Sequence, residues 1–389
     1  MMNPADRPDD APFGIYVHWP FCLAKCPYCD VNSHVRHRPV DTDAFGAALV
    51  RELDFFHGQT TGRTVTSVFF GGGTPSLMPP AEVARVIDRI AANWGVAEDV
   101  EITLEANPTS AEARNFQGYR AAGVNRLSVG IQALDDHSLR ALGRRHSAAE
   151  GLAAWRLAAR LFERTSFDLI YARPGQTLAG WGAELARALA QAPGHMSLYQ
   201  LTIEPNTPYA ALHAAGSLAM PDEDLAADLY DLTSDLTAAA GLLAYEVSNH
   251  ARPGDESRHN LLYWRYGDYI GIGPGAHARI GDVGARRALV NAKHPETWLD
   301  LVQRHGTGAG EDITLSGPEQ ASEMLLMGMR LGEGIDPVRY GRLAGRPLAP
   351  GRVSELAEQG LLAINGDGRI AATAHGRRVL NAIIARLAS

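Results

Sequence analysis

The fold is decided by residues 14–29, Gly14-Ile15-Tyr16-Val17-His18-Trp19-Pro20-Phe21-Cys22-Leu23-Ala24-Lys25-Cys26-Pro27-Tyr28-Cys29. The first six of these residues alternate in the manner of a short strand, which Pro20 ends. A loop follows from residue 21 to about residue 34 and carries all three cysteines of the chain. A loop of this kind, directly after the first strand, favours a working cofactor site.

The same strand–loop–helix pattern repeats along the chain. Further strands are predicted at residues 65–70, 100–105, 126–131, 166–171 and 195–201, and helices at 42–56, 80–94, 151–161 and 180–190. About six such units between Gly14 and Tyr245 indicate an α/β fold with a parallel sheet. The sheet either closes partly into a barrel or stays open and doubly wound. Ligands are expected where the strands end.

A different pattern begins near residue 314. Helices are predicted at 318–331, 352–359 and 374–387, with a hairpin at 361–370 around Asn365-Gly366 and Asp367-Gly368. Helices with a small hairpin resemble a winged-helix module. We therefore expect a disordered lead at 1–12, a core at 13–245, a connecting segment at 246–313 and a winged-helix-like domain at 314–389.

Composition narrows the function classes. The formal net charge of the 389-residue chain is -8, which disfavours non-specific binding to nucleic acid or anionic lipid. No run approaches the roughly 20 apolar residues that span a bilayer, and residues 1–12 contain no signal-peptide pattern. We therefore expect a cytoplasmic protein without nucleic-acid partners. Three clustered cysteines in a reducing compartment indicate metal binding rather than disulfides.

Cys22, Cys26 and Cys29 have the spacing for an iron–sulfur cluster. A [4Fe–4S] cube held only by protein takes four thiolates, so three leave one iron open. That iron can bind the amino and carboxylate groups of the methionyl part of S-adenosylmethionine (SAM). The alternatives are a structural zinc held with His34 or His18, or free thiols that pack as small hydrophobic groups.

The Cys-x3-Cys-x2-Cys spacing resembles the signature of radical SAM enzymes. Its flanks, residues 15–22 and 29–34, resemble the oxygen-independent coproporphyrinogen oxidase-like branch, and within it the haem chaperones. The likeness extends from about Phe13 to the C-terminal helices. It implies an incomplete (β/α)6 radical SAM barrel with a small C-terminal helical, winged-helix-like domain.

A glycine run, Gly71-Gly72-Gly73-Thr74-Pro75, follows the second strand. Alone it could be a mere turn, but its glycines permit close backbone approach, and it resembles the GGGTP motif of this family. The resemblance implies that SAM is contacted by Tyr16, Tyr28, Gly72, Gly73, Thr74, Glu105, Gln132, Arg144 and Asp168. Ala172-Arg173 departs from the Gly-Leu that is usual in the family.

Two features separate the branches of the family. The decarboxylase branch resembles Cys-x3-Cys-x2-Cys-x-Cys, which has a fourth cysteine two residues after the third. In this chain Val31 stands at that position. Residues 259–264, His-Asn-Leu-Leu-Tyr-Trp, match the HNxxYW motif of the haem chaperones. By this likeness His259 is an axial iron ligand, and Tyr263 and Trp264 stack on the porphyrin. His277 is a second ligand candidate.

The sequence thus favours a haem chaperone that binds a [4Fe–4S] cluster, SAM and haem and delivers haem to acceptor haemoproteins, respiratory ones among them. An electron donor such as flavodoxin or ferredoxin and a second copy of the chain are further candidate partners. The first alternative is an enzyme: a coproporphyrinogen III oxidase, or a radical enzyme acting on another tetrapyrrole. The second is a non-redox barrel with structural zinc. No catalytic residue is assigned.

Overall fold

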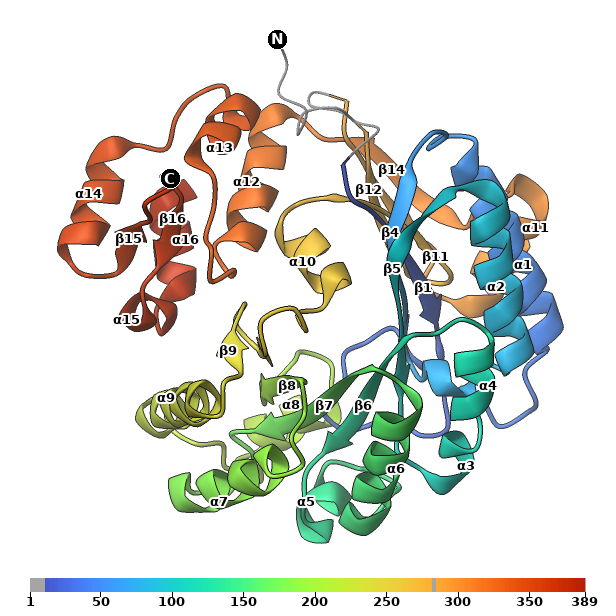
Figure 1. Cartoon of the computed structure of the whole chain (residues 1–389), viewed down its shortest axis with the longest axis horizontal. Coiled ribbons are helices and arrows are strands. Elements are labelled where there is room, and N and C mark those ends of the chain that lie inside the picture. Colours follow the sequence, from blue (N-terminus) through green and yellow to red (C-terminus); the bar gives the residue numbers. More distant parts are fainter. Residues whose placement is uncertain (1–10, 282–284, 389) are drawn as a thin grey trace.

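The chain folds around one curved sheet, and Figure 1 shows helices packed along its outer side. The computed structural model describes residues 11–281 and 285–388, and within them this sheet has twelve strands. Except for residues 11 and 12, the lead predicted for residues 1–12 lies outside the described residues.

Six neighbouring strands are parallel and form the barrel part of the sheet. In sheet order they are β1 (Phe13–Trp19), β4 (Thr64–Gly72), β5 (Gly95–Ala106), β6 (Arg126–Gln132), β7 (Arg164–Tyr171) and β8 (His195–Gln200). The helices between them are α1 (Thr42–His57), η2 (Pro75–Leu77), α2 (Pro80–Asn93), α3 (Ser110–Ala113), α4 (Phe116–Ala121), α5 (Asp136–Ala141), α6 (Ala148–Leu161) and α7 (Leu178–Leu189). The predicted α/β fold is confirmed.

Short strands extend the sheet beyond both ends of the barrel. After β8 and the helices α8 (Pro208–Ala214) and α9 (Glu223–Ala239) come β9 (Leu243–Ala244) and β10 (Asn249–Ala251), which are antiparallel to each other. At the other end, β11 (Asp268–Ile272) lies parallel to β1, and β12 (His277–Ile280), β13 (Arg287–Asn291) and β14 (Ala309–Thr314) continue antiparallel. The sheet therefore runs from β14 to β9 without closing, and the barrel is incomplete.

Residues 246–313 thus contribute more than the predicted connecting segment. They hold β10 to β14, α10 (Arg258–Trp264) and α11 (Pro295–His305). The strand pattern was not recognised there because these strands are only three to six residues long, too short for a clear period of two. We call β11 to β14 the antiparallel extension.

Polar side chains cap the starts of several helices. Asp41 accepts a hydrogen bond from the Ala44 backbone nitrogen at the start of α1 (3.0 Å). Ser147 and Glu150 form a capping box on α6. Such caps satisfy backbone donors that have no partner within the helix.

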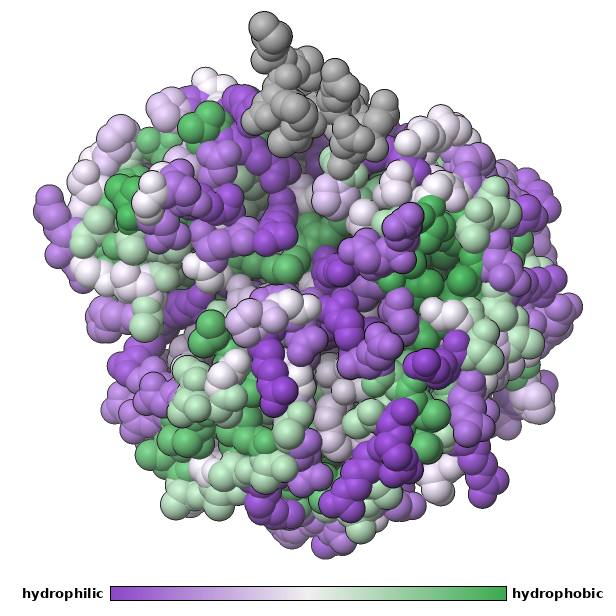
Figure 2. Space-filling view, in the orientation of Figure 1, coloured by the Kyte–Doolittle hydropathy of each residue, from purple (hydrophilic) through white to green (hydrophobic). Residues whose placement is uncertain are grey.

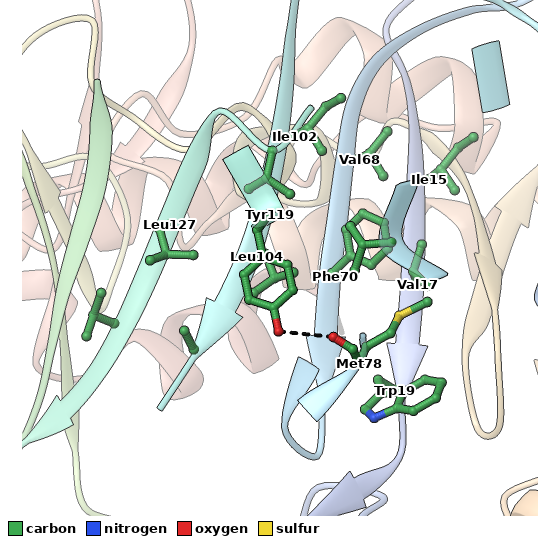
Figure 3. Close-up of a cluster of buried hydrophobic side chains, with 14 of the residues drawn as sticks. Ile15, Val17, Trp19, Val68, Phe70, Met78, Ile102, Leu104, Tyr119 and Leu127 are labelled. Carbon is green, nitrogen blue, oxygen red and sulfur yellow. Dashed lines mark hydrogen bonds between the residues drawn. The ribbon is translucent and has the colours of Figure 1, made fainter. Parts of the chain in front are cut away.

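The outward face of the barrel strands makes the main core. Along β1 the residues Phe13, Ile15, Val17 and Trp19 are almost fully buried, and Figure 3 shows three of them beside Val68, Phe70, Ile102 and Leu104 of the next strands. The Tyr119 hydroxyl donates to the Met78 carbonyl (3.0 Å), which ties α4 to the loop before α2. Because successive side chains of a strand point to opposite faces of the sheet, the side chains at the intervening positions point into the barrel.

Helix α10 lies on the concave side of the sheet (Figure 1). A Cβ on Gly14 of β1 would lie 3.0 Å from Leu262 and 3.3 Å from the His259 ring, so glycine is needed for this close approach. One Glu101 oxygen accepts from the His259 backbone nitrogen (3.1 Å), and the other pairs with Arg164 (2.8 Å). The helix is thereby fixed at the end of the barrel where β6 and β7 begin.

The C-terminal residues form a helical unit with one hairpin. Its elements are α12 (Gly317–Gly328), α13 (Pro337–Ala344), α14 (Pro350–Glu358), β15 (Leu362–Ile364), β16 (Ile370–Ala372), α15 (Ala374–Arg377) and α16 (Leu380–Ala388). Leu325, Leu356 and Ile383 lie in a core separate from that of the barrel. The single helix predicted at 374–387 is two helices, α15 and α16.

Across the described ranges, no helix is both long and apolar enough to cross a membrane. On the face shown in Figure 2, hydrophobic residues gather in several separate groups between hydrophilic ones.

A buried glutamate joins α1 to the antiparallel extension. Glu52 is fully buried and accepts hydrogen bonds from the backbone nitrogens of Gly308 (2.7 Å) and Gly273 (2.8 Å). The Trp298 indole (3.0 Å) and the Asn291 amide (3.1 Å) also donate to it. Burial raises the pKa of Glu52 from 4.5 to about 7, although the four donors oppose the shift.

We predict that Glu52→Gln lowers the free energy of unfolding by about 1–3 kcal/mol, because the new amide group faces donors that then lack an acceptor. The pKa of Glu52 is about 7 in the folded chain but near the ordinary 4.5 in the unfolded chain. The contribution of Glu52 to the free energy of unfolding therefore decreases as the pH rises from about 4.5 to about 7. The penalty of the substitution should therefore be smaller at pH 8 than at pH 5. Urea unfolding at both pH values measures this, with exposed Glu98→Gln as control; equal penalties at both pH values would contradict the assignment.

Candidate functional site

The cysteine loop begins where β1 ends and returns beside its own start. Residues Phe21–Cys22 (β2) pair with His34–Val35 (β3), and the His34 backbone nitrogen donates to the Pro20 carbonyl (2.7 Å). All three cysteines are free thiols and half-buried. The loop therefore presents three sulfurs at the end of the barrel where the parallel strands terminate.

Two anchors hold this loop across the mouth of the incomplete barrel. The Asn32 amide donates to the carbonyls of Pro274 and Lys293 in the antiparallel extension, at 2.9 Å each. On the other side, the Tyr209 backbone nitrogen of α8 donates to the Pro27 carbonyl (3.0 Å). The loop is thus tied to segments that lie beyond both ends of the parallel strands.

The two histidines considered as zinc ligands are engaged in hydrogen bonds. His18 Nε2 donates to the Asn32 carbonyl (2.9 Å), so His18 Nδ1 accepts from the Tyr16 hydroxyl (3.0 Å). Burial lowers the pKa of His18 to about 4, which keeps the ring neutral. His34 Nε2 lies 3.2 Å from the Asn32 side-chain oxygen. Both histidines therefore shape the loop.

The surroundings of the cysteines fit an iron–sulfur cluster. Among the described residues no three His, Cys, Asp or Glu side chains converge as around a single metal ion, and a cube does not need this because each thiolate binds a different iron. Burial raises the pKa of Cys22 and Cys29, so metal must displace their protons. Arg144 Nη1 lies 3.7 Å from Cys26 Sγ and would stabilise a negatively charged cluster.

The glycine run closes against the cysteine loop. A Cβ on Gly73 would lie 2.8 Å from the Pro20 carbonyl and 3.0 Å from Cys22 Sγ. Gly72 has φ +114, and a Cβ there would meet the His18 ring at 2.7 Å. The Thr74 hydroxyl lies 3.2 Å from Cys22 Sγ. Only glycine allows this approach, which brings the predicted SAM residues Gly72, Gly73 and Thr74 beside the predicted cluster.

Gln132 and Arg144 meet at the ends of β5 and β6. Arg144 donates to the Gly130 carbonyl (3.0 Å) and to the Asn107 side chain. Gln132 has φ +69, and its buried side-chain oxygen has no hydrogen-bond partner within the described chain. A strained residue with an unsatisfied buried acceptor fits a ligand site, because a bound donor would satisfy the oxygen.

Glu105 and Asp168 place two carboxyl groups inside the barrel. Asp168 accepts from the hydroxyls of Ser128 (2.7 Å) and Ser166 (2.6 Å). Burial and the nearby Asp168 raise the pKa of Glu105 to about 8, and burial also raises the pKa of Asp168. A cationic ligand beside this pair would favour the ionised forms of both groups. SAM, which carries a sulfonium and an ammonium group, has the required charge.

The two predicted tyrosines have different neighbours. Tyr16 stacks on Phe69 inside the barrel, with ring centroids 6.2 Å apart. Tyr28 lies near Tyr209 of α8, with centroids 6.3 Å apart, and its hydroxyl interacts with Cys26 and Arg144. Most of the nine predicted SAM residues thus lie at or directly after the ends of the barrel strands, whereas Tyr16 and Asp168 lie within β1 and β7.

Some residues of the site were not predicted. Asn107, directly after β5, donates to the Thr74 hydroxyl (3.3 Å) and accepts from Arg144; its position at a strand end was the available signal. Asn32 has no sequence signal of its own. Arg173, the departure from the family pattern, is buried and forms an ion pair with Glu184 of α7. Its charge therefore has a structural partner.

The motif residues predicted to bind haem all lie in α10 but differ in their burial and in their access to a cavity. His259 is buried, with its Nδ1 2.9 Å from the Ser67 hydroxyl, and burial lowers its pKa to about 3. Its Nε2 is also buried and has no partner among the described residues. Trp264 is half-buried. Tyr263, in contrast, faces a cavity.

This cavity has a volume of about 610 Å³ and lies between the cysteine loop and the antiparallel extension. We call it the loop cavity. Its lining comes from β1, the cysteine loop, α10 and the extension: Tyr16, His18, Lys25, Asp30, Val31, Asn32, Ser33, His34, Tyr263, Tyr269, Gly275, Ala276, His277 and Lys293. Neither His259 nor Trp264 is part of this lining, whereas Tyr263 and His277 are.

Known proteins resemble this chain over nearly its whole length. Residues 16–185 match the Radical SAM superfamily, and residues 315–379 match the HemN C-terminal domain. Radical S-adenosyl methionine domain-containing protein 1, mitochondrial, of Bos taurus is 40% identical, over 96% of this chain and 87% of the relative. Heme chaperone HemW of Escherichia coli K12 is 36% identical, over 96% and 97%.

Among solved structures, coproporphyrinogen III oxidase (HemN) of Escherichia coli matches with a TM-score of 0.81. The match covers 99% of this chain and 92% of that chain, at 24% sequence identity. This likeness supports the radical SAM fold described above. The resemblance drawn from the cysteine spacing is confirmed.

We predict that Gly73→Ala displaces the cysteine loop, because its Cβ meets backbone atoms of Pro20, at a cost of about 1–3 kcal/mol. The iron bound per chain after anaerobic reconstitution should fall, as measured by iron analysis and visible absorbance. The control is Gly351→Ala in α14, where a Cβ meets nothing within 4 Å. Wild-type iron content in Gly73→Ala would refute the close contact.

We predict that Asn32→Asp loosens the cysteine loop, because a carboxylate cannot donate to the two carbonyls that Asn32 now binds. Losing these donors should cost about 1–3 kcal/mol locally. Hydrogen exchange of residues 26–35 should accelerate, and reconstituted iron should be lost faster to a chelator. Asn365→Asp, in the exposed hairpin turn, serves as the matched control. Unchanged exchange would show that Asn32 is no anchor.

Proposed function

This chain belongs to the radical SAM superfamily and, within it, to the HemN-like family near HemW, and we propose that it is a haem chaperone. In this function the protein binds haem and delivers it to acceptor haemoproteins. Support comes from the relatives named heme chaperone HemW, at 34–36% identity over nearly their full length. Support also comes from the HNxxYW motif at residues 259–264.

We propose that Cys22, Cys26 and Cys29 hold a [4Fe–4S] cluster. SAM would be held by Glu105, Gln132, Arg144 and Asp168 together with the other residues predicted to contact it. When bound, such a cluster supplies an electron that can cleave the sulfonium. The chain's own contribution is to bind and orient: the Gly72–Gly73 backbone lies against the loop, and Arg144 supplies positive charge beside Cys26. The cluster would serve regulation, dimerisation or haem transfer.

One observation carries the proposal: the loop cavity opens directly on the cysteine loop. Its volume of about 610 Å³ falls within the range of roughly 300–1,000 Å³ usual for cofactor sites. Val31, which replaces the fourth cysteine of the decarboxylase pattern, is 40% exposed and lines it. Tyr263 of the HNxxYW motif lines it as well. An apolar residue at position 31 suits a porphyrin contact.

The proposal includes the partners and compartment predicted from the sequence. We propose that acceptor haemoproteins, respiratory ones among them, receive the haem in the cytoplasm. A flavodoxin or ferredoxin would reduce the cluster. A homodimer would form when the cluster is loaded.

A second candidate function is a radical reaction on a tetrapyrrole, such as oxidation of coproporphyrinogen III. The observation that favours it is that the predicted SAM residues Gly72, Gly73 and Thr74 lie beside the loop that carries the three cysteines. Val31 weighs against it, as do the relatives named as chaperones.

We predict that the anaerobically reconstituted protein binds haem in a saturable manner and does not turn over coproporphyrinogen III. Haem titration followed by absorbance and a turnover assay with SAM and reductant, on the same sample, measure both. Substituting all three cysteines with serine provides the cluster-free control. Turnover, or the absence of saturable haem binding, would overturn the chaperone assignment.

A further inference from the structure

Resting on the proposed function, we infer that the loop cavity is the haem site, that His277 is the iron ligand, and that His259 is a positioning residue. In this arrangement the HNxxYW motif contributes the Tyr263 ring to the cavity. The iron ligand comes instead from the start of β12 in the antiparallel extension.

The accessibility of the two histidines separates their roles. The His259 ring is 1% exposed, whereas His277 is exposed and lines the cavity. The described chain forms no hydrogen bond to the His277 ring, while His259 Nδ1 is held by Ser67 at 2.9 Å. Partial desolvation of the ring by the cavity wall lowers the pKa of His277, and the positive charges of Arg279 and Lys293 add to the effect. Its imidazole is therefore neutral and available to a metal near neutral pH.

The position of His259 explains a positioning role. Its ring contacts the Tyr263 ring edge-on, with centroids 4.5 Å apart, and stacks on Phe69 at 5.2 Å. Tyr263 in turn lies 4.3 Å from Tyr269, centroid to centroid. His259 thus supports a pair of tyrosines on the cavity wall. Aromatic rings in such a wall can pack against a porphyrin face.

The charge of the cavity suits a ligand with carboxylates. Lys25 and Lys293 line it, and Asp30 is the single acid among the described lining residues. Neither lysine forms a salt bridge within the described chain, where arginines take most of the acidic partners. In a chain of net charge -8 this is a locally basic place. Haem carries two propionates, which these ammonium groups would neutralise.

The test compares His277→Ala, His259→Phe and the exposed control His305→Ala in the full chain. Haem affinity is measured by absorbance titration, and the iron ligand is identified by electron paramagnetic resonance of the ferric form. We expect His277→Ala to bind haem about tenfold more weakly or worse, a change of about 1.4 kcal/mol, and to lose the histidine signature. Added imidazole should restore that signature. His259→Phe and His305→Ala should keep it.

The carboxylate contact has its own test with the same protein. The wild type should bind haem more tightly than haem dimethyl ester. Lys25→Gln combined with Lys293→Gln should reduce this preference, while the histidine signature persists. An unchanged preference would overturn the assignment of the lysines.

The outcomes distinguish the site from the function. If His277→Ala keeps wild-type affinity and signature, while imidazole rescues a lost signature in His259→Phe or His259→Ala, the iron ligand is His259. The inference is then overturned and the chaperone function stands. If the wild type binds no haem at all, the proposed function itself fails.

Discussion

The site depends on Asn32, whose side chain and backbone together join the cysteine loop to the rest of the barrel mouth. Its amide binds two carbonyls of the antiparallel extension, and its carbonyl accepts from His18 of β1. A Cβ on Gly275 would lie 2.5 Å from the Asn32 amide nitrogen, so the facing turn must be glycine. Because one residue fixes the loop against the extension, the predicted cluster and the loop cavity share a common wall.

The barrel could be predicted because its strands follow simple rules. The alternation in β1, the stop at Pro20 and the regular spacing of strands and helices are properties of neighbouring residues. The antiparallel extension could not be predicted in this way, since its strands are short and pair with distant segments. Glu52 illustrates the same limit: its four donors come from residues 273–308, which nothing in the local sequence of α1 indicates.

The sequence predicted which residues form the candidate site more fully than it predicted how they are arranged in space. Cysteine spacing, the glycine run and polar residues at strand ends identified the groups that the structure gathers. A motif, however, gives residue types and not the face of the helix that each occupies. In α10 the histidine of the motif points into the barrel and the tyrosine toward the cavity, and this depends on contacts with Gly14 and Ser67 from other parts of the chain.

The paired carboxyl groups of Glu105 and Asp168 have a thermodynamic consequence. With a pKa of about 8, Glu105 carries a proton at neutral pH. A cation that enters the barrel lowers this pKa and so expels the proton into the solvent. A cation that occupies the barrel therefore replaces a proton, so that at neutral pH the empty barrel does not hold two uncompensated negative charges.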